Sequence, residues 1–216
     1  MALTTYQYNK SIDRFIRASG FLFLIFGLLT VVLRITQFFI LGDPPLEQLV
    51  VADPFLLLQG IPSLAAAIFF LLGTAALHLR QAHRTGTVGL VVLIIAFSGL
   101  TLSTGAMWTY GFTAPELARE APSLLTSPTS GVIHAVLVSM VIGQVGWLLM
   151  AIMALWANVI PRWASLTAIV SILLVVVLTP FSQTQLLRLV YNARLGLGPL
   201  AVGYVLWRGH GNVPSG

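Results

Sequence analysis

The sequence predicts an all-α fold: a polytopic membrane protein built as a six-transmembrane-helix bundle, with both termini in the cytoplasm. Three observations predict it. The chain of 216 residues is 57% hydrophobic and only 8% charged, whereas a soluble domain carries about 25% charged residues. Six apolar stretches are each close to the ~20 residues that a helix needs to cross a bilayer. The basic residues outside these stretches gather on one side of the resulting topology.

The apolar stretches define the predicted spans, which are 18–41, 55–78, 88–109, 131–157, 163–180 and 186–207. Together they occupy nearly all of 1–216, so we expect a single membrane domain. Residues 1–17 are too polar and too long for the n-region of a cleaved signal peptide, and no A-x-A site follows them. The first span is therefore expected to be retained, with Ile12, Phe15 and Ile16 forming a short interfacial helix ahead of it.

The basic residues predict the orientation. Seven of them fall on one side: Lys10, Arg14, Arg17, Arg80, Arg84, Arg162 and Arg208. The loops of the opposite side hold only Arg119. Because Lys and Arg are retained in cytoplasmic segments, we expect both termini and the turns 79–87 and 158–162 inside, and 42–54 and 111–130 outside. The predicted location is the inner or plasma membrane, as a multi-pass protein.

Residue types exclude several kinds of chemistry. The chain has no cysteine, which removes disulfides, thiolate metal sites and a cysteine nucleophile. Lys10 is the only lysine and no carboxylate falls within a span, so neither a retinal Schiff base nor a carboxylate relay for protons or sodium is expected. His78 and His134 lie nearly a bilayer apart and cannot ligate one haem iron. We expect no metal and no cofactor.

Neither catalysis nor nucleic-acid binding is indicated. The sequence contains no H-E-x-x-H, P-loop or paired-carboxylate motif, so an enzyme is the less favoured class of protein. The basic residues stand singly at helix ends instead of in runs, which is typical of membrane orientation and not of a nucleic-acid surface. The expected partners are membrane lipids, with a second membrane protein or another copy of the chain as further candidates.

Polar residues in the outer half of three spans form the candidate ligand site, which consists of Arg34, Gln37, Gln59, Tyr191, Asn192 and Arg194. Arginine at the centre of the hydrocarbon costs about 2.5–3.5 kcal/mol on insertion scales, so it usually faces the bundle or reaches the surface. Guanidinium groups suit carboxylate and phosphate oxygens, which predicts an anionic or carbonyl-bearing amphiphile as ligand. The alternative is structural: Arg34 pairs with Asp43, Glu47 or Asp53 of the following loop.

Small residues predict how two of the spans pack. Ser139, Gly143 and Gly146 give the fourth span a small-residue face for a neighbouring helix. Pro199, with glycines at positions 196, 198 and 203, makes the last span the one expected to bend.

Two boundary segments carry a resemblance to a family. Residues 156–164 read W-A-N-V-I-P-R-W-A, and 203–208 read G-Y-V-L-W-R. In this respect the chain resembles uncharacterised bacterial six-span membrane proteins of the domain-of-unknown-function type, mainly over residues 156–208. The resemblance implies the six-span layout and no site residues.

The combined interpretation is a non-enzymatic multi-pass membrane protein. It binds a lipid or small anionic amphiphile in an outer-leaflet polar pocket, or it acts as an accessory subunit of a larger complex. The alternative is a transporter or permease-like protein for a small anionic substrate. These hypotheses differ in whether the ligand crosses the membrane.

Overall fold

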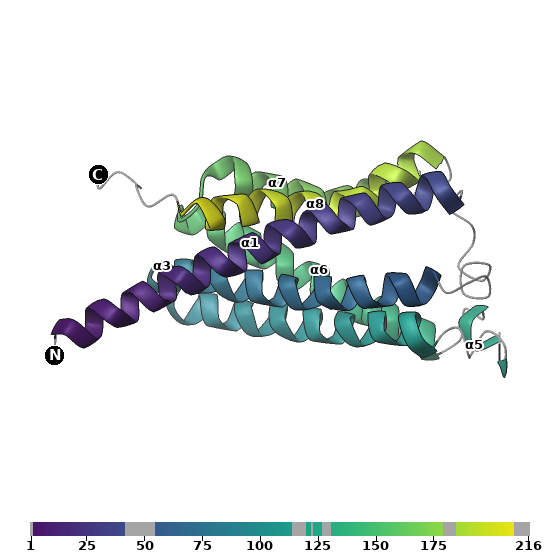
Figure 1. Ribbon diagram of the computed structural model, residues 1–216, viewed down its shortest axis with the longest axis horizontal. Helices are drawn as coiled ribbons and strands as arrows, with labels where there is room; N and C mark the ends of the chain where they lie inside the picture. The colour runs from purple at the N-terminus through teal and green to yellow at the C-terminus, as the bar shows by residue number, and fades with distance from the viewer. Residues whose placement is uncertain are drawn as a thin grey trace.

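The computed structural model describes residues 2–41, 55–113, 120–121, 123–126, 131–178 and 185–209. Every regular element within these ranges is helical, which confirms the predicted all-α class. In chain order the elements are α1 (Ala2–Leu41), α3 (Phe55–Trp108), the π-helix η1 (Thr109–Thr113), α5 (Ser123–Thr126), α6 (Gly131–Ala157), α7 (Arg162–Leu178) and α8 (Gln185–Arg208). Figure 1 shows the long helices lying side by side along one axis of an elongated bundle.

Helix α3 reverses direction at Gly86. The backbone there has φ 51° and ψ −137°, a conformation outside the helical region that glycine adopts without steric cost. Figure 1 shows the two halves of α3 running next to each other in opposite directions. The reversal falls inside the turn predicted at 79–87.

Three segments of the described chain are long and apolar enough to cross a membrane: Lys10–Leu33, Leu64–Ala106 and Leu137–Ala157. They support the prediction of a membrane protein, although three segments do not by themselves give six crossings. The second segment has 43 residues and includes the reversal at Gly86. As one straight helix it would measure about 65 Å, roughly twice the ~30 Å hydrocarbon layer.

The N-terminal helix differs from the sequence prediction. Instead of a short interfacial helix followed by a span, α1 is one continuous helix of 40 residues, about 60 Å long. Its first turns extend beyond the other helices in Figure 1. Ile16, expected at the membrane interface, is buried in the hydrophobic core. The residues predicted to form a short helix leading into the first span are helical, but they are part of α1 itself, because the polar start of the chain continues the same helical path.

Helices α1 and α8 pack antiparallel with their backbones in contact. Gly20 and Gly27 of α1 lie against Gly196 and Gly203 of α8, and the spacing is seven residues on both helices. A Cβ at Gly27 would lie 2.6 Å from the carbonyl oxygen of Gly196, and a Cβ at Gly203 would lie 2.8 Å from that of Gly20. Two of the glycines predicted to bend the last span, Gly196 and Gly203, form this contact surface, and α8 continues as one helix through Pro199.

The predicted small-residue face of α6 packs against the second half of α3. A Cβ at Gly143 would lie 2.9 Å from the Ser103 hydroxyl oxygen, and Gly146 lies directly against Ala96. The Ser103 hydroxyl donates a hydrogen bond to the carbonyl oxygen of Ser139 at 3.0 Å. These contacts confirm the packing role predicted for the residues of α6.

An aromatic cluster joins α1, α3 and α6. Phe23 of α1 is fully buried and stacks on Phe70 of α3 with ring centroids 5.3 Å apart. Trp147 of α6 meets Phe23 edge-on at 5.4 Å. Gly73 leaves room for the Phe23 ring, which occupies the place of a side chain there. This cluster is the centre of the hydrophobic core between the three helices.

Candidate functional site

One end of the bundle carries seven of the 11 Lys and Arg residues, and we call it the basic end. It contains the N-terminal half of α1, the reversal in α3, the connection from α6 to α7 and the end of α8 (Figure 1). The seven basic residues predicted to share one side of the membrane all lie in these segments. Among the described residues, Asp13 is the only carboxylate of the basic end. The basic end therefore has a large excess of positive charge.

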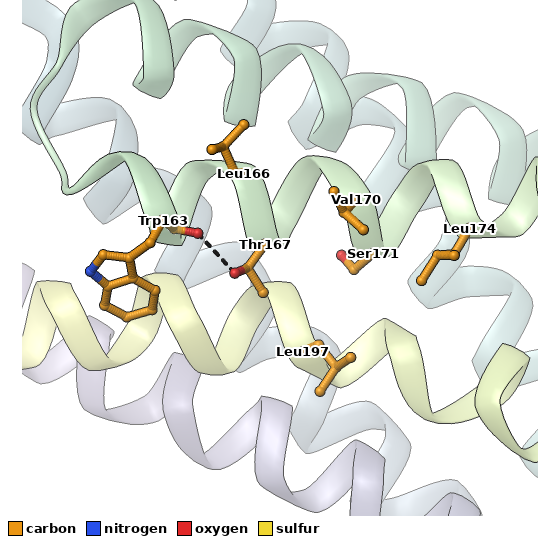
Figure 2. Close-up of a pocket in the computed structure, with 7 residues that line it drawn as sticks. All are labelled: Trp163, Leu166, Thr167, Val170, Ser171, Leu174 and Leu197. Carbon is orange, nitrogen blue, oxygen red and sulfur yellow. Dashed lines mark hydrogen bonds between the residues drawn. The ribbon is translucent and has the colours of Figure 1, made fainter.

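An apolar groove runs along the outside of the bundle between α7 and α8, with a volume of about 380 Å³. It is lined by Trp163, Leu166, Thr167, Val170, Ser171, Leu174 and Leu197. Figure 2 shows Trp163 and Thr167 on the α7 side and Leu197 on the α8 side. An adjoining groove of about 500 Å³ extends the same surface to Leu24 and Leu28 of α1. The two share Trp163, Thr167 and Leu197 and form one continuous lining.

Small residues at the helix contact create this groove. Ala164 and Ala168 of α7 are fully buried, and a Cβ at Gly198 of α8 would lie 3.0 Å from the Ala168 Cα. The two helices therefore approach closely at their contact line, while larger side chains stand on either side of it. The Thr167 hydroxyl donates to the Trp163 carbonyl oxygen at 2.8 Å. Its donor is thus satisfied within α7, and the groove surface suits a hydrocarbon chain.

Two arginines lie where the groove reaches the basic end. The Arg208 guanidinium carbon lies 4.9 Å from the ring centroid of Tyr204, which lines the groove. On α1, Arg17 precedes Leu24 by seven residues, which is two helical turns, so both positions share one face. The Arg17 guanidinium lies against Gly209, where a Cβ would be 2.8 Å from its Nε. The Arg208 guanidinium thus lies beside the groove lining, and the Arg17 guanidinium lies next to it at the end of α8.

The positive charge at the groove mouth has little compensation. Arg162 immediately precedes Trp163, whose ring centroid lies 6.5 Å from that of Tyr204 across the mouth. Asp13 lies one turn before Arg17 on α1, and its electrostatic interaction is with Arg80 of α3. The other described carboxylate, Glu120, precedes α5 at the opposite end of the bundle. The arginines around the mouth are thus available to an anion.

The six residues predicted from the sequence lie on three helices, toward the end opposite the basic end. Arg34 and Gln37 are on α1, Gln59 is on α3, and Tyr191, Asn192 and Arg194 are on α8. Their side chains lie outside the described part of the structure, so their convergence on one cavity stays a prediction. The predicted loop partners of Arg34, which are Asp43, Glu47 and Asp53, also lie outside it.

The packing of α1 on α8 places two of these positions at one level. Gly27 is in contact with both Gly196 and Leu200. Seven residues further along α1 is Arg34, and the same distance back from Gly196 and Leu200 along antiparallel α8 leads to positions 189 and 193. Asn192 lies between these two positions and is about one turn before Gly196, which faces α1. Arg34 is also the next position in the seven-residue series formed by Gly20 and Gly27. Positions 34 and 192 therefore belong to the same helix interface.

Position 194 lies on a different side of α8. Gly196 faces α1, whereas Gly198 faces α7, where a Cβ would lie 2.9 Å from the Ser171 hydroxyl oxygen. Arg194 is four residues before Gly198, about one helical turn, and shares its face. The backbone thus groups Arg194 with the α7–α8 interface and Arg34 with the α1–α8 interface.

Polar groups buried near the basic end were not predicted from the sequence. Gln81 is fully buried; its Nε2 donates to the Met150 sulfur at 3.6 Å, and its Oε1 has no partner among the described residues. The Nδ1 atom of His78, one turn earlier on α3, is also buried without a hydrogen-bond partner among the described residues. The Arg84 guanidinium donates to the Ala157 carbonyl oxygen at 2.7 Å, at the end of α6. In the sequence, only the three-residue spacing of positions 78, 81 and 84 indicates this row of polar residues.

These buried groups do not extend to a metal site. The ranges that the structure describes contain no cluster of three or more His, Cys, Asp or Glu side chains that could hold a metal ion.

Comparison of the chain with family models, with curated protein sequences and with solved structures gives no match. The resemblance to bacterial six-span proteins stays a prediction, and the functional argument depends on the residues of this chain.

Proposed function

We propose that this chain is a non-enzymatic, multi-pass protein of the inner or plasma membrane that crosses the bilayer six times. The reversal at Gly86 divides a 43-residue apolar segment into two halves that are each close to the ~20 residues of one crossing. With α1, α6, α7 and α8 this makes six. An even number of crossings returns the chain to its starting side, in agreement with the start of α1 and the end of α8 at one end of the bundle (Figure 1).

The proposed orientation has the basic end in the cytoplasm. Its support is the gathering of seven basic residues from four separate segments at that end. Lys and Arg next to membrane spans are retained on the cytoplasmic side, whereas acidic residues contribute little. The connection from α3 to α6 and the end of α1 then lie outside.

The ligand proposed for this protein is an anionic or carbonyl-bearing amphiphile, held between α1 and α8. The observation that carries the proposal is the position of Arg34. At Gly20 and Gly27, even a Cβ would be too close to the backbone of α8. At the next position of the same series stands an arginine, whose side chain needs far more room. Such a side chain requires α1 and α8 to lie further apart at this level than at the two glycines, and this extra room is where we propose that the ligand binds.

The chemistry of this space selects the ligand class. A guanidinium in the hydrocarbon layer requires a polar or charged partner, and its planar fork matches carboxylate and phosphate oxygens. Gln37 is one turn from Arg34 on α1, and Asn192 is level with Arg34 on α8. We propose that the side-chain amides of both residues donate hydrogen bonds to the same ligand. The competing partners of Arg34 are the carboxylates of the loop after α1.

Thermal unfolding in a neutral detergent tests this proposal, with sodium laurate and lauryl alcohol as probes. We expect laurate to raise the Tm of the parent protein and the alcohol to have little effect. Binding at a hundred times Kd stabilises a folded protein by about 2.7 kcal/mol. Arg34→Leu should abolish the rise, whereas Arg14→Leu, which removes the same charge at the exposed basic end, should retain it.

Two outcomes would contradict the ligand proposal. If Arg34→Leu responds to laurate as the parent does, Arg34 does not hold the carboxylate. If laurate has no effect and the variants Asp43→Asn, Glu47→Gln or Asp53→Asn lower the Tm as much as Arg34→Leu, the arginine has a structural partner. Arg34-dependent flux of laurate across proteoliposomes would favour the alternative, a transporter for a small anionic substrate.

A further inference from the structure

The groove on α1, α7 and α8 has the length of one bilayer leaflet. Its α7 side extends from Trp163 to Leu174, which is eleven residues or about 16 Å of helix. Half of the ~30 Å hydrocarbon layer is about 15 Å. The groove starts at the basic end and runs toward the middle of the bundle. Its dimensions thus suit one acyl chain from the leaflet that borders the basic end.

Aromatic side chains place the mouth of the groove at the membrane surface. Trp163 is 50% exposed and Trp207 is 46% exposed, and Tyr204 lies between α7 and Arg208. Trp and Tyr are enriched at the boundary between hydrocarbon and headgroups. The guanidinium groups beside these rings would accordingly lie at the depth of lipid phosphates.

The charge at the mouth distinguishes between lipid headgroups. Arg17 and Arg208 lie next to each other in space, because the Arg17 guanidinium is against Gly209, the residue after Arg208. The Arg208 guanidinium also lies over the Tyr204 ring of the groove, and Arg162 directly precedes Trp163 of the lining. In a zwitterionic headgroup the phosphate is neutralised by a cationic group of the same lipid. In a headgroup with a net negative charge the phosphate has no such partner and binds the arginines more strongly. A basic residue near an anionic membrane surface contributes about fivefold to binding.

We propose that this groove is a binding site for an anionic phospholipid. One acyl chain lies along α7 and α8, and the phosphate lies between Arg17 and Arg208 with Arg162 nearby. The site is separate from the predicted pocket at Arg34, which is about 25 Å away along α1 by the helical rise. It concerns a structural lipid of the surrounding leaflet and does not depend on the ligand proposed for the other end.

Quenching of tryptophan fluorescence by brominated lipids tests this proposal. The full-length protein is reconstituted into phosphatidylcholine vesicles that contain either dibrominated phosphatidylglycerol or dibrominated phosphatidylcholine. The contribution of Trp163 is the difference between the parent and Trp163→Phe. We expect phosphatidylglycerol to reach Trp163 with a relative binding constant about 25-fold higher than phosphatidylcholine, from two arginines at about fivefold each.

Matched variants separate the site from general surface charge. The double variant R17Q/R208Q should bring the preference close to one. The double variant K10Q/R14Q removes the same number of charges from the same end and should retain it. Leu197→Phe, which narrows the groove without changing its charge or adding a tryptophan, should reduce quenching by both lipids, and Arg34→Leu should leave all values unchanged.

Several results would overturn the proposal. They are equal quenching of Trp163 by both lipids in the parent, an equal loss of preference in K10Q/R14Q and R17Q/R208Q, and protection of Trp163 from both lipids. The last result would show that a protein segment, such as a second copy of the chain, occupies the groove.

Discussion

Replacing Gly27 by alanine should destabilise the protein, because backbone atoms of α8 occupy the space that a methyl group needs. A Cβ at this position would lie 2.6 Å from the carbonyl oxygen of Gly196 and 2.7 Å from the backbone nitrogen of Leu200. Ordinary contact begins near 3.4 Å, so α1 and α8 would have to move apart by about 0.8 Å. Such overpacking lowers the free energy of unfolding by about 1–3 kcal/mol. Alanine is a better helix former than glycine, which offsets at most about 1 kcal/mol of this loss. We expect a net loss of about 1–2 kcal/mol.

Reversible unfolding by SDS in mixed micelles, followed by circular dichroism, measures this loss. Gly105→Ala is the matched control, because Gly105 is also helical and nothing lies within 4 Å of a Cβ there. The control should be neutral or up to about 1 kcal/mol more stable than the parent. If Gly27→Ala is as stable as Gly105→Ala, the close contact of α1 with α8 is wrong.

Three further substitutions test other contacts by the same measurement. Phe23→Ala removes the fully buried ring at the centre of the aromatic cluster and should cost about 3–5 kcal/mol; a loss below about 1 kcal/mol would show that the cluster does not hold α1. Gln81→Leu removes a buried amide oxygen without a partner among the described residues and should stabilise the protein by about 1 kcal/mol, whereas a loss would reveal a partner. Arg84→Met breaks the hydrogen bond to Ala157 and should cost about 1.5–3 kcal/mol; an unchanged stability would make that contact dispensable.

Hydropathy predicted the helices well because apolar stretches of bilayer length end at polar or helix-breaking residues. The predicted span 131–157 coincides with α6, which is followed by Asn158 with a positive φ of 50° and by Pro161. The reversal at Gly86 falls in a turn predicted from polar residues alone. Hydropathy could not predict the start of α1, because a polar helix outside the membrane has no apolar pattern.

The pairing of helices was not predictable from single spans. Gly196 and Gly203 were interpreted as sites of bending, since glycine permits both a bend and a close approach. The seven-residue spacing is the same in α1, at Gly20 and Gly27, and this match indicates the pairing only once both helices are considered together. The small-residue face of α6 was predicted correctly, but its partner on α3 was not.

The two candidate sites were also only partly predictable from the sequence. Arg17 and Arg208 were predicted to orient the chain in the membrane. The groove exists only because α1, α7 and α8, which are distant in the sequence, meet there. The polar residues of the other end stand out in the sequence because they interrupt apolar spans. The packing of α1 on α8 puts positions 34 and 192 at one helix interface. The arrangement of the six side chains stays a prediction.

The central claim is that the chain crosses the membrane six times with its basic end inside. Because the chain contains no cysteine, single cysteines introduced one at a time report the topology without background. We choose Ser11, Gly86, Asn158 and Gly209 at the basic end and Glu120 at the opposite end. The measurement is labelling by a membrane-impermeant maleimide in intact and in permeabilised cells.

The account predicts that Glu120→Cys is labelled in intact cells, and that the four cysteines of the basic end are labelled only after permeabilisation. The reverse pattern would contradict the orientation and leave the number of crossings intact. Labelling of Gly86→Cys and Glu120→Cys from the same side would contradict the six crossings themselves, because the second half of α3 would then not span the membrane.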